Sequence, residues 1–322
     1  MTTAAAPGVS AASASSASSA SSAVSAPSAS APGPGRALKT SGRPGAAAAV
    51  LVLGSCTSLQ VGAALAMRLF PVTGAPGATL LRVGLAGILL LAVVRPRVRD
   101  WRPAQWRAVL LYGVSIAGTN GFFYAALARL PLGAAVTIQF LGPLTLAAAL
   151  SRRGRDVGWV LLAVIGVLTL GLAGSHSAAG RPLDPVGVAF ALVSAAFWAS
   201  YILAGSRASA AVPGRGGLAV AMSAGALVLV RFGAHGAVRL AADPHLIALA
   251  FGMAVLASVV PYSLELAAMR RSPRRVFGIL LSLEPAVATL AGWLLLGQHT
   301  SPVAIAAVVI VVGASLGSTL GV

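Results

Sequence analysis

Apolar stretches of about 20 residues recur along almost the whole chain, and this feature limits the possible folds more than any other. A hydrocarbon core of about 30 Å takes roughly 20 helical residues to cross. Only short loops separate the stretches. We therefore predict an all-α, polytopic membrane protein with ten transmembrane helices. The expected spans lie near residues 46–67, 76–94, 107–127, 131–150, 157–174, 185–204, 217–232, 246–268, 276–296 and 302–320.

The composition agrees with a chain that faces lipid. Hydrophobic residues make up 57% of the chain and charged residues 9%, whereas a soluble domain carries about 25% charged residues. The net charge of +17 could indicate a nucleic-acid partner. However, the arginines are dispersed between apolar stretches, without a basic domain or interleaved aromatics, which argues against nucleic acid. The single cysteine, Cys56, can form no internal disulfide.

The basic residues predict the orientation of the chain. If the N-terminus is cytoplasmic, seventeen of the 23 Lys and Arg residues fall in inner loops and five in outer loops. Only Arg82 then lies within a span. The positive-inside rule produces this asymmetry, and one helix more or fewer would disrupt it. We therefore expect a protein of the cytoplasmic membrane with both termini in the cytoplasm.

The chain also divides into a tail and two similar halves. Residues 1–45 are nearly all Ala, Ser, Pro and Gly without an apolar core, which predicts a disordered cytoplasmic tail. The pattern from Pro131 to Pro143 returns from Pro273 to Pro285, at a constant offset of 142 residues. Five spans per half is an odd number, so the second copy must be inverted. Inverted repeats are typical of secondary transporters, and the expected halves are 46–174 and 185–322.

Six segments between residues 46 and 322 occur in a characteristic order and spacing. They are LRVGLAG, LLYGVSIAGTNGFFYAAL, PLGAAVTIQFLGPL, FWASYILAG, VVPYSLELAAM and FGILLSLEPAVATLAG. On these segments the chain, over essentially residues 46–322, resembles the EamA branch of the drug/metabolite transporter superfamily and, within it, the threonine/homoserine exporters. The resemblance implies proton-driven export of amino acids or related metabolites, without a cofactor. Gln139 and Gln298 stand where glutamate is usual in the family.

Charged residues within the spans are the first candidates for a mechanism, because a charge in the membrane needs a partner, a water-filled cavity or a function. Glu284 lies in the ninth expected span, and we expect it to alternate between a proton and the substrate ammonium. The structural alternative is an acid that supports a proline kink. Arg82 could bind a substrate carboxylate through its guanidinium fork, or extend to the membrane interface. Glu265 is expected to form an interfacial ion pair with Arg270 or Arg271.

Polar and aromatic residues on other expected spans could line a central cavity with Arg82. Three prolines are expected to break helices and free backbone carbonyls, which a membrane tolerates where they line a cavity or are buried. Each aromatic residue could also serve only for packing or for anchoring at the interface. The candidate lining residues are Asn120, Tyr124, Gln139, Trp198, Tyr201 and Tyr262, and the prolines are Pro143, Pro261 and Pro285.

Small residues recur every four positions on the first expected span, at Gly54, Ser58, Gly62 and Ala66. Such stripes allow helix backbones to approach closely, so we expect them to serve for packing.

A membrane enzyme is the rival class, but the four histidines show no metal-ligand spacing and the chain has no ATP-binding signature. Among transporters, a broad drug or metabolite exporter is the second hypothesis. The expected partners are a small solute, protons and lipid.

Overall fold

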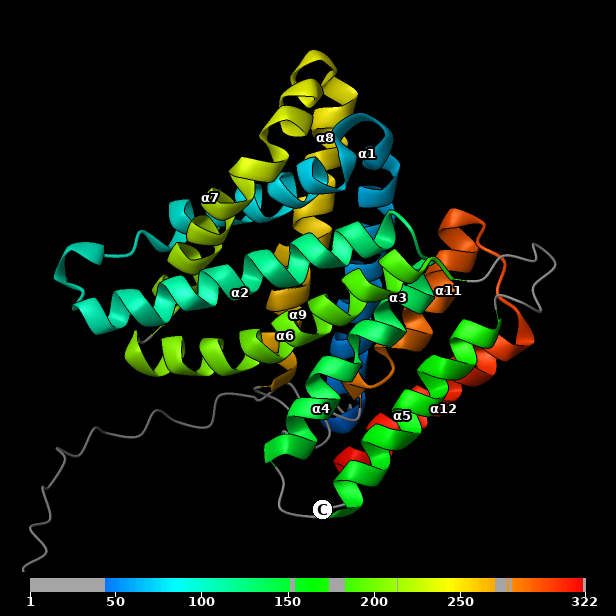
Figure 1. The fold of residues 1–322 in the computed structure, drawn as a ribbon. Coiled ribbons are helices and arrows are strands. Elements are labelled where there is room, and N and C mark those ends of the chain that lie inside the picture. Colours follow the sequence, from blue (N-terminus) through cyan, green and yellow to red (C-terminus); the bar gives the residue numbers. More distant parts are fainter. Residues whose placement is uncertain are drawn as a thin grey trace, which may run out of the picture. The chain divides into compact units, whose positions relative to one another are not determined.

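The structure is a computed structural model, and it describes residues 44–150, 154–173, 183–212, 214–269, 277 and 280–320 (Figure 1). Every regular element in these ranges is helical, which confirms the all-α prediction there. The expected tail, 1–45, lies outside these ranges except for its last two residues. The elements are α1 (Pro44–Val94), η1 (Val98–Asp100), α2 (Pro103–Leu127), α3 (Leu132–Gln139), α4 (Leu141–Leu150), α5 (Gly154–Ala173), α6 (Pro185–Ala211), α7 (Gly216–Val238), η3 (Arg239–Ala242), α8 (Pro244–Ala254), η4 (Val255–Val259), α9 (Val260–Met269), α11 (Glu284–Leu296) and α12 (Pro302–Leu320).

Six described stretches are long and apolar enough to cross a membrane, and two shorter apolar helices, Glu284–Leu296 and Pro302–Ser318, follow them. Each of the ten expected spans overlaps a described helix. The number of crossings nevertheless remains a prediction, because length and apolarity alone identify six. These are Ala47–Val94, Pro103–Leu127, Leu132–Leu150, Pro185–Ala211, Gly216–Val238 and Pro244–Glu265.

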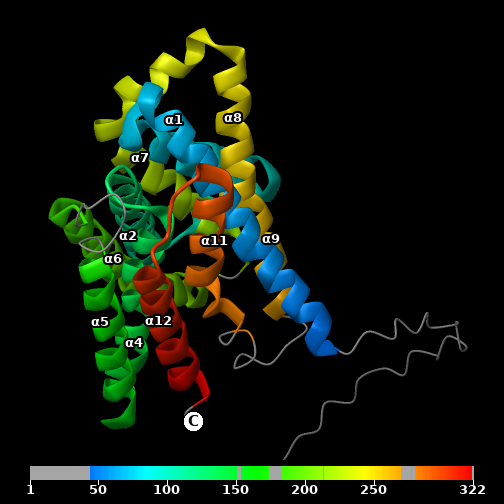
Figure 2. The same ribbon diagram turned by 90° about the vertical axis from the view of Figure 1, so that its right-hand side faces the viewer.

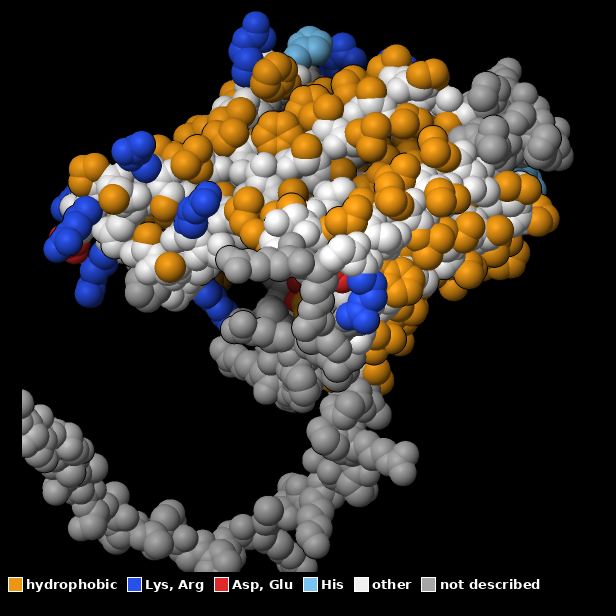
Figure 3. Space-filling view, turned by 60° about the horizontal axis from the view of Figure 1, so that its bottom comes forward, with side chains coloured by type: hydrophobic (Ala, Val, Ile, Leu, Met, Phe, Trp, Pro, Cys, Tyr) orange, Lys and Arg blue, Asp and Glu red, His pale blue; other side chains and the backbone are white. Residues whose placement is uncertain are grey.

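Large apolar side chains cover much of the surface of the described helices. Leu227 is 74% exposed, Phe232 68% and Ile88 64%. Figure 3 shows such side chains spread over one face, with Lys and Arg side chains mainly toward its margins. Contiguous apolar surface on this scale is unfavourable in water and marks contact with a membrane or a partner. Lipid is the solvent that suits these helices.

The first helix, α1, contains two of the expected spans. Gly74 interrupts it with φ +66° and ψ 166°, and Pro71 and Pro76 lie on either side. A positive φ is readily adopted by glycine, which has no Cβ to clash. The chain therefore changes direction through a broken helix. The loop expected between residues 67 and 76 is helical except at this point.

Two further interruptions lie close to expected helix-breaking prolines. The helix of the fourth expected span divides at Phe140, three residues before Pro143, into α3 and α4. In the ninth expected span, α11 begins at Glu284 and Pro285 lies in its first turn. Proline is favourable there, because the first amides of a helix have no partner within it. Glu284 thus lies at a helix N-terminus and not in the middle of a continuous helix.

The described helices pack in pairs and around α1. In both ribbon views α5 runs along α12 (Figures 1 and 2), and α2 packs along α6. The α1 helix contacts α7, α8, η4 and α9. The largest apolar cluster holds Leu69, Tyr124, Leu127, Leu132 and Met253, which are almost fully buried. Segments far apart in the sequence therefore surround one core.

An ion pair connects the loop between α2 and α3 to the start of α6. Arg129 Nη1 lies 2.7 Å from Asp184 Oδ2. Asp184 also caps α6, since its Oδ1 accepts hydrogen bonds from the amides of Val186 and Gly187. The hydrogen bond from Arg129 and these amides hold the pKa of Asp184 below its usual range. The capping carboxylate is therefore ionised near neutral pH.

One of the small residues on α1, Gly62, packs closely against the backbone of another helix. A Cβ added at Gly62 would lie 2.6 Å from the backbone nitrogen of Ala257 in η4. At Gly54 the nearest atom would be Leu264 Cδ1 at 3.5 Å, an ordinary contact. Overpacking typically costs about 1–3 kcal/mol, and a backbone obstacle leaves little room to relax. We expect Gly62→Ala to lower the thermal unfolding midpoint in detergent, and Gly54→Ala to leave it unchanged or raised. Equal midpoints for the two variants would contradict this packing.

Candidate functional site

A cavity of about 290 Å³ lies between α1, α2, α6, η4 and the segment that leads into α11. Both halves of the chain contribute to its wall. Of the other candidates, Tyr124 and Pro285 are buried beside lining residues, and the side chain of Tyr262 lies outside the described residues. The candidate residues that line the cavity are Arg82, Asn120, Gln139, Pro143, Trp198, Tyr201, Pro261, Glu265 and Glu284.

Pro261 is responsible for the polar character of one wall. It has no amide hydrogen to give to the carbonyl four or five residues earlier, at Ala257 or Leu256. Side chains of α1 bond these two carbonyls: Arg82 Nη2 donates to Ala257 at 2.9 Å, and Ser58 Oγ donates to Leu256 at 2.8 Å. The π-helical turn η4 ends just before this proline. The irregular backbone and the polar side chains of α1 therefore satisfy each other.

The buried guanidinium of Arg82 has further partners around it. Its Nη1 donates to the Tyr124 hydroxyl at 3.4 Å, and its Nε approaches Ser258 Oγ at 3.5 Å. The guanidinium carbon also lies 5.5 Å from the centre of the Tyr124 ring, a cation–π distance. Arg82 is 8% exposed. It is directed inward rather than toward the membrane interface.

Glu284 lines the same cavity in buried surroundings. Its Oε1 accepts a weak hydrogen bond from Gln60 Nε2 at 3.4 Å, and it is 6% exposed. As the first residue of α11, it lies where the helix dipole favours negative charge. The ion pair that the described residues form is Arg129–Asp184, so Arg82 and Glu284 line the same cavity without a direct bridge between them.

Glu265 lies at the cavity and contacts a polar residue of α1. Its Oε1 accepts a hydrogen bond from Ser55 Oγ at 2.8 Å, and the residue lines the cavity. Arg270 and Arg271, its expected partners, lie outside the described residues. The ion pair therefore remains a prediction, while the contact with Ser55 directs this acid toward α1.

Hydrogen bonds join three helices on the opposite wall. Gln139 Nε2 donates to Ser194 Oγ at 2.7 Å, and Ser194 Oγ donates to the carbonyl of Thr119 at 2.8 Å. Asn120 Nδ2 donates to the carbonyl of Ile116 within its own helix. The two hydrogen bonds of Ser194 fix α2, α3 and α6 relative to one another next to the cavity.

Two aromatic residues of α6 line the cavity beside these hydrogen bonds. Trp198 packs edge-on against Phe140, with ring centroids 5.6 Å apart. Tyr201 contacts Tyr112, with centroids 5.2 Å apart. Trp198 and Tyr201 line the cavity, while Tyr112 lines a neighbouring one.

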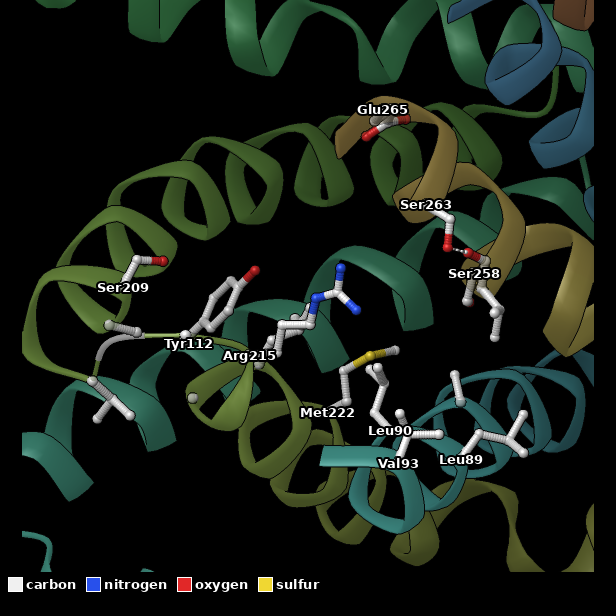
Figure 4. Close-up of a pocket in the computed structure, with 17 residues that line it drawn as sticks. Leu89, Leu90, Val93, Tyr112, Ser209, Arg215, Met222, Ser258, Ser263 and Glu265 are labelled. Carbon is white, nitrogen blue, oxygen red and sulfur yellow. Dashed lines mark hydrogen bonds between the residues drawn. The ribbon is translucent and has the colours of Figure 1, made fainter. Parts of the chain in front are cut away.

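The neighbouring cavity has a volume of about 450 Å³ and is the space drawn in Figure 4. It lies between the end of α1, the start of α7 and α9. Arg215 extends into it beside Tyr112 and Met222 (Figure 4). Glu265 lines both cavities. The two spaces therefore adjoin at Glu265, and we refer to the larger one as the vestibule.

Sequence reasoning missed four polar residues at the site: Gln60, Thr119, Ser194 and Ser258. Gln60 and Thr119 line the cavity, and Ser194 and Ser258 bond residues that line it. Each of these polar residues interrupts an apolar stretch, and this interruption is the sequence signal that marks it as a candidate. Which serines and threonines turn toward a cavity depends on the rotation of each helix, and sequence alone does not give this rotation.

The contacts of Arg82 predict that lysine cannot replace it. An ammonium keeps the charge but lacks the planar fork that reaches Ala257, Ser258 and Tyr124 together. Because the freed carbonyl would be left without its partner, we expect Arg82→Lys to destabilise the protein by about 1–3 kcal/mol. Thermal unfolding in detergent measures this. Arg231→Lys, at an exposed position, is the matched control and should have no effect. An Arg82→Lys protein as stable as wild type would contradict the role of the fork.

The family and the relatives that match this chain are transporters. The model of the EamA-like transporter family matches residues 185–320. The threonine/homoserine exporter RhtA of Escherichia coli (strain K12) is 41% identical over 276 residues, which are 85% of this chain and 91% of the exporter. RhtA of Salmonella typhimurium (strain LT2) is 40% identical over 274 residues, 84% of this chain and 90% of that protein. One solved crystal structure shares the fold with a TM-score of 0.56 at 18% identity, covering 84% of this chain and 95% of that one.

Proposed function

Because this chain belongs to the EamA-like transporter family, we propose that it exports threonine, homoserine and closely related amino acids across the cytoplasmic membrane. The observation that carries the proposal is the 41% identity, over 91% of its length, to a protein named as a threonine/homoserine exporter. The relatives are exporters and the family consists of transporters, so the chain is a membrane transporter and not an enzyme.

The cavity suits a free amino acid. A zwitterion carries a carboxylate and an ammonium group on one carbon atom. The Arg82 guanidinium is the available donor for the carboxylate, since Arg binds carboxylates through parallel hydrogen bonds. Glu284, which lines the same cavity, is the acceptor for the ammonium. The side chain of the amino acid would then contact other lining residues, namely Asn120, Gln139, Trp198 and Tyr201. Tyr124 positions Arg82 by accepting a hydrogen bond from its Nη1. We keep Tyr262 as a further proposed contact.

The proposed architecture is ten crossings in two inverted halves, residues 46–174 and 185–322, with both termini and the tail in the cytoplasm. The helix interruption at Phe140 supports it. At the offset of 142 residues the corresponding position is Ser282, where the chain turns before α11. The two interruptions fall at corresponding positions, each three residues before a proline, as two repeated halves would require. Discontinuous helices at equivalent positions are frequent at transporter binding sites.

The proposed transport cycle is alternating access with proton antiport. With the N-terminus inside, Val93 and Arg215 belong to the cytoplasmic side, so the vestibule would lie on that side. The adjoining cavity at Glu265 then corresponds to an inward-facing state, ready to receive a cytoplasmic amino acid. Glu284 would exchange the amino acid for a proton on the outer side, since an acid among apolar helices marks a proton path by default.

Exchange by the wild-type protein tests the substrate, and the Glu284→Gln variant tests proton coupling. Wild-type protein in proteoliposomes should exchange labelled threonine and homoserine, and a pH gradient should drive their accumulation. Glu284→Gln keeps the shape but cannot exchange a proton, so we expect accumulation to lose its dependence on the gradient. Asp184→Asn is the control: asparagine also caps helices, and Asp184 is partly exposed and does not line the cavity, so coupling should persist. Wild-type pH dependence in Glu284→Gln would refute proton coupling at this acid.

A broad drug or metabolite exporter is the second hypothesis from the sequence. A panel of growth-inhibiting amino acids and drugs, tested in a strain that expresses the protein, separates the two functions. Resistance limited to threonine, homoserine and close analogues supports the proposed function. Resistance to unrelated drugs would favour the alternative.

A further inference from the structure

Thr119 differs from most other threonines in the described helices. In a helix, a threonine hydroxyl usually donates to the carbonyl of the preceding turn. Six described threonines do so, each to the residue four positions earlier. The Thr119 hydroxyl makes no such bond to Ser115 and is buried without any hydrogen-bond partner. The six are Thr73, Thr79, Thr137, Thr145, Thr169 and Thr289.

Buried polar atoms without partners concentrate at the cavity. Among the described residues there are three such side-chain atoms: Gln60 Oε1, Thr119 Oγ1 and Trp159 Nε1. Gln60 and Thr119 both line the 290 Å³ cavity. A buried polar group without a partner costs about 1–3 kcal/mol, so a native protein retains it for a reason. A partner that arrives with the solute is such a reason.

The position of Thr119 is fixed although its hydroxyl is free. Its carbonyl accepts the hydrogen bond from Ser194 Oγ on α6, and Ser194 is in turn bonded by Gln139 of α3. Contacts between three helices therefore hold this point of α2. A group that must recognise a ligand works best when its surroundings keep it in place before binding.

We propose that the Thr119 hydroxyl selects solutes that carry a hydroxyl on their side chain. This inference rests on the proposed function. Threonine and homoserine share such a hydroxyl beyond their common zwitterion. With Arg82 and Glu284 engaged by the zwitterion, the solute side chain is left for the α2 wall. The Thr119 oxygen is enclosed in this structure, so the proposed binding includes a rotation of its side chain toward the cavity, where the hydroxyl donates to the solute hydroxyl and accepts from it. A methyl group in the same place would leave Thr119 unpaired, and sites built to bond a hydroxyl reject analogues that lack it.

Valine is the matched probe, because it replaces the threonine hydroxyl with a methyl group. We would measure how well unlabelled threonine and valine inhibit the exchange of labelled threonine in proteoliposomes. The ratio of the two inhibition constants is the selectivity. Norvaline, which replaces the hydroxyl of homoserine with a methyl group, repeats the comparison for homoserine.

Thr119→Val should lower the selectivity by about 3- to 10-fold, corresponding to one lost neutral hydrogen bond, and it should act mainly on threonine. Thr119→Ser keeps a hydroxyl and should retain most of the selectivity. Thr137→Val is the matched control: Thr137 donates to Gly133 of its own helix at 2.6 Å and does not line the cavity. Its selectivity should equal that of wild type.

Several results would overturn the inference while the proposed function stands. Unchanged selectivity in Thr119→Val would show that the hydroxyl does not select, and this includes an equal loss of affinity for threonine and valine. The same would follow if Thr119→Ser lost selectivity as fully as Thr119→Val. Absence of threonine exchange by wild-type protein is a separate result, which would refute the proposed function itself.

Discussion

A buried arginine among apolar helices is the constraint on which the rest of the structure depends. A charge at the centre of a membrane helix costs about 2.5–3.5 kcal/mol on insertion scales, and a buried guanidinium away from water needs fixed partners. Pro261 supplies one of them, since it frees the carbonyl of Ala257 that Arg82 then bonds. Ser58 bonds the carbonyl of Leu256 in the same way. The close packing of Gly62 on η4 brings these groups together. Small residues, a proline and a charge on different helices thus form one unit.

The consequence of this arrangement is a polar cavity that holds an arginine and two acids without a direct ion pair between them. The partners that bond Arg82 are neutral, so its positive charge is left for a ligand in the cavity. A solute with one carboxylate and one ammonium group complements such a wall, whereas an uncharged solute would leave Arg82 without a counter-charge. The described helices present apolar side chains on their outer surface. The chemistry of the protein is therefore concentrated inside, in the manner expected of a carrier for polar molecules.

The sequence predicted the helices well because lipid requires about 20 apolar residues for each crossing. It also singled out Arg82 and Glu284, from the cost of placing a charge in the membrane, but it left open whether Arg82 faces a cavity or the membrane interface. It did not predict the break of α1 at Gly74, or that α11 begins at Glu284, because these depend on local backbone geometry. Gln60 and Thr119 escaped notice because an unpaired atom can be recognised only when every possible partner has a position in space.

The central claim is that the solute occupies the cavity between Arg82 and Glu284. Modification by a membrane-permeant carbodiimide, which reacts with carboxyl groups in apolar surroundings, tests it directly through mass spectrometry of the peptide that contains Glu284. The account predicts that Glu284 is labelled in the purified protein and that threonine or homoserine protects it in a saturable manner, while valine protects less. Labelling of Glu284 that saturating threonine leaves unchanged would contradict the account.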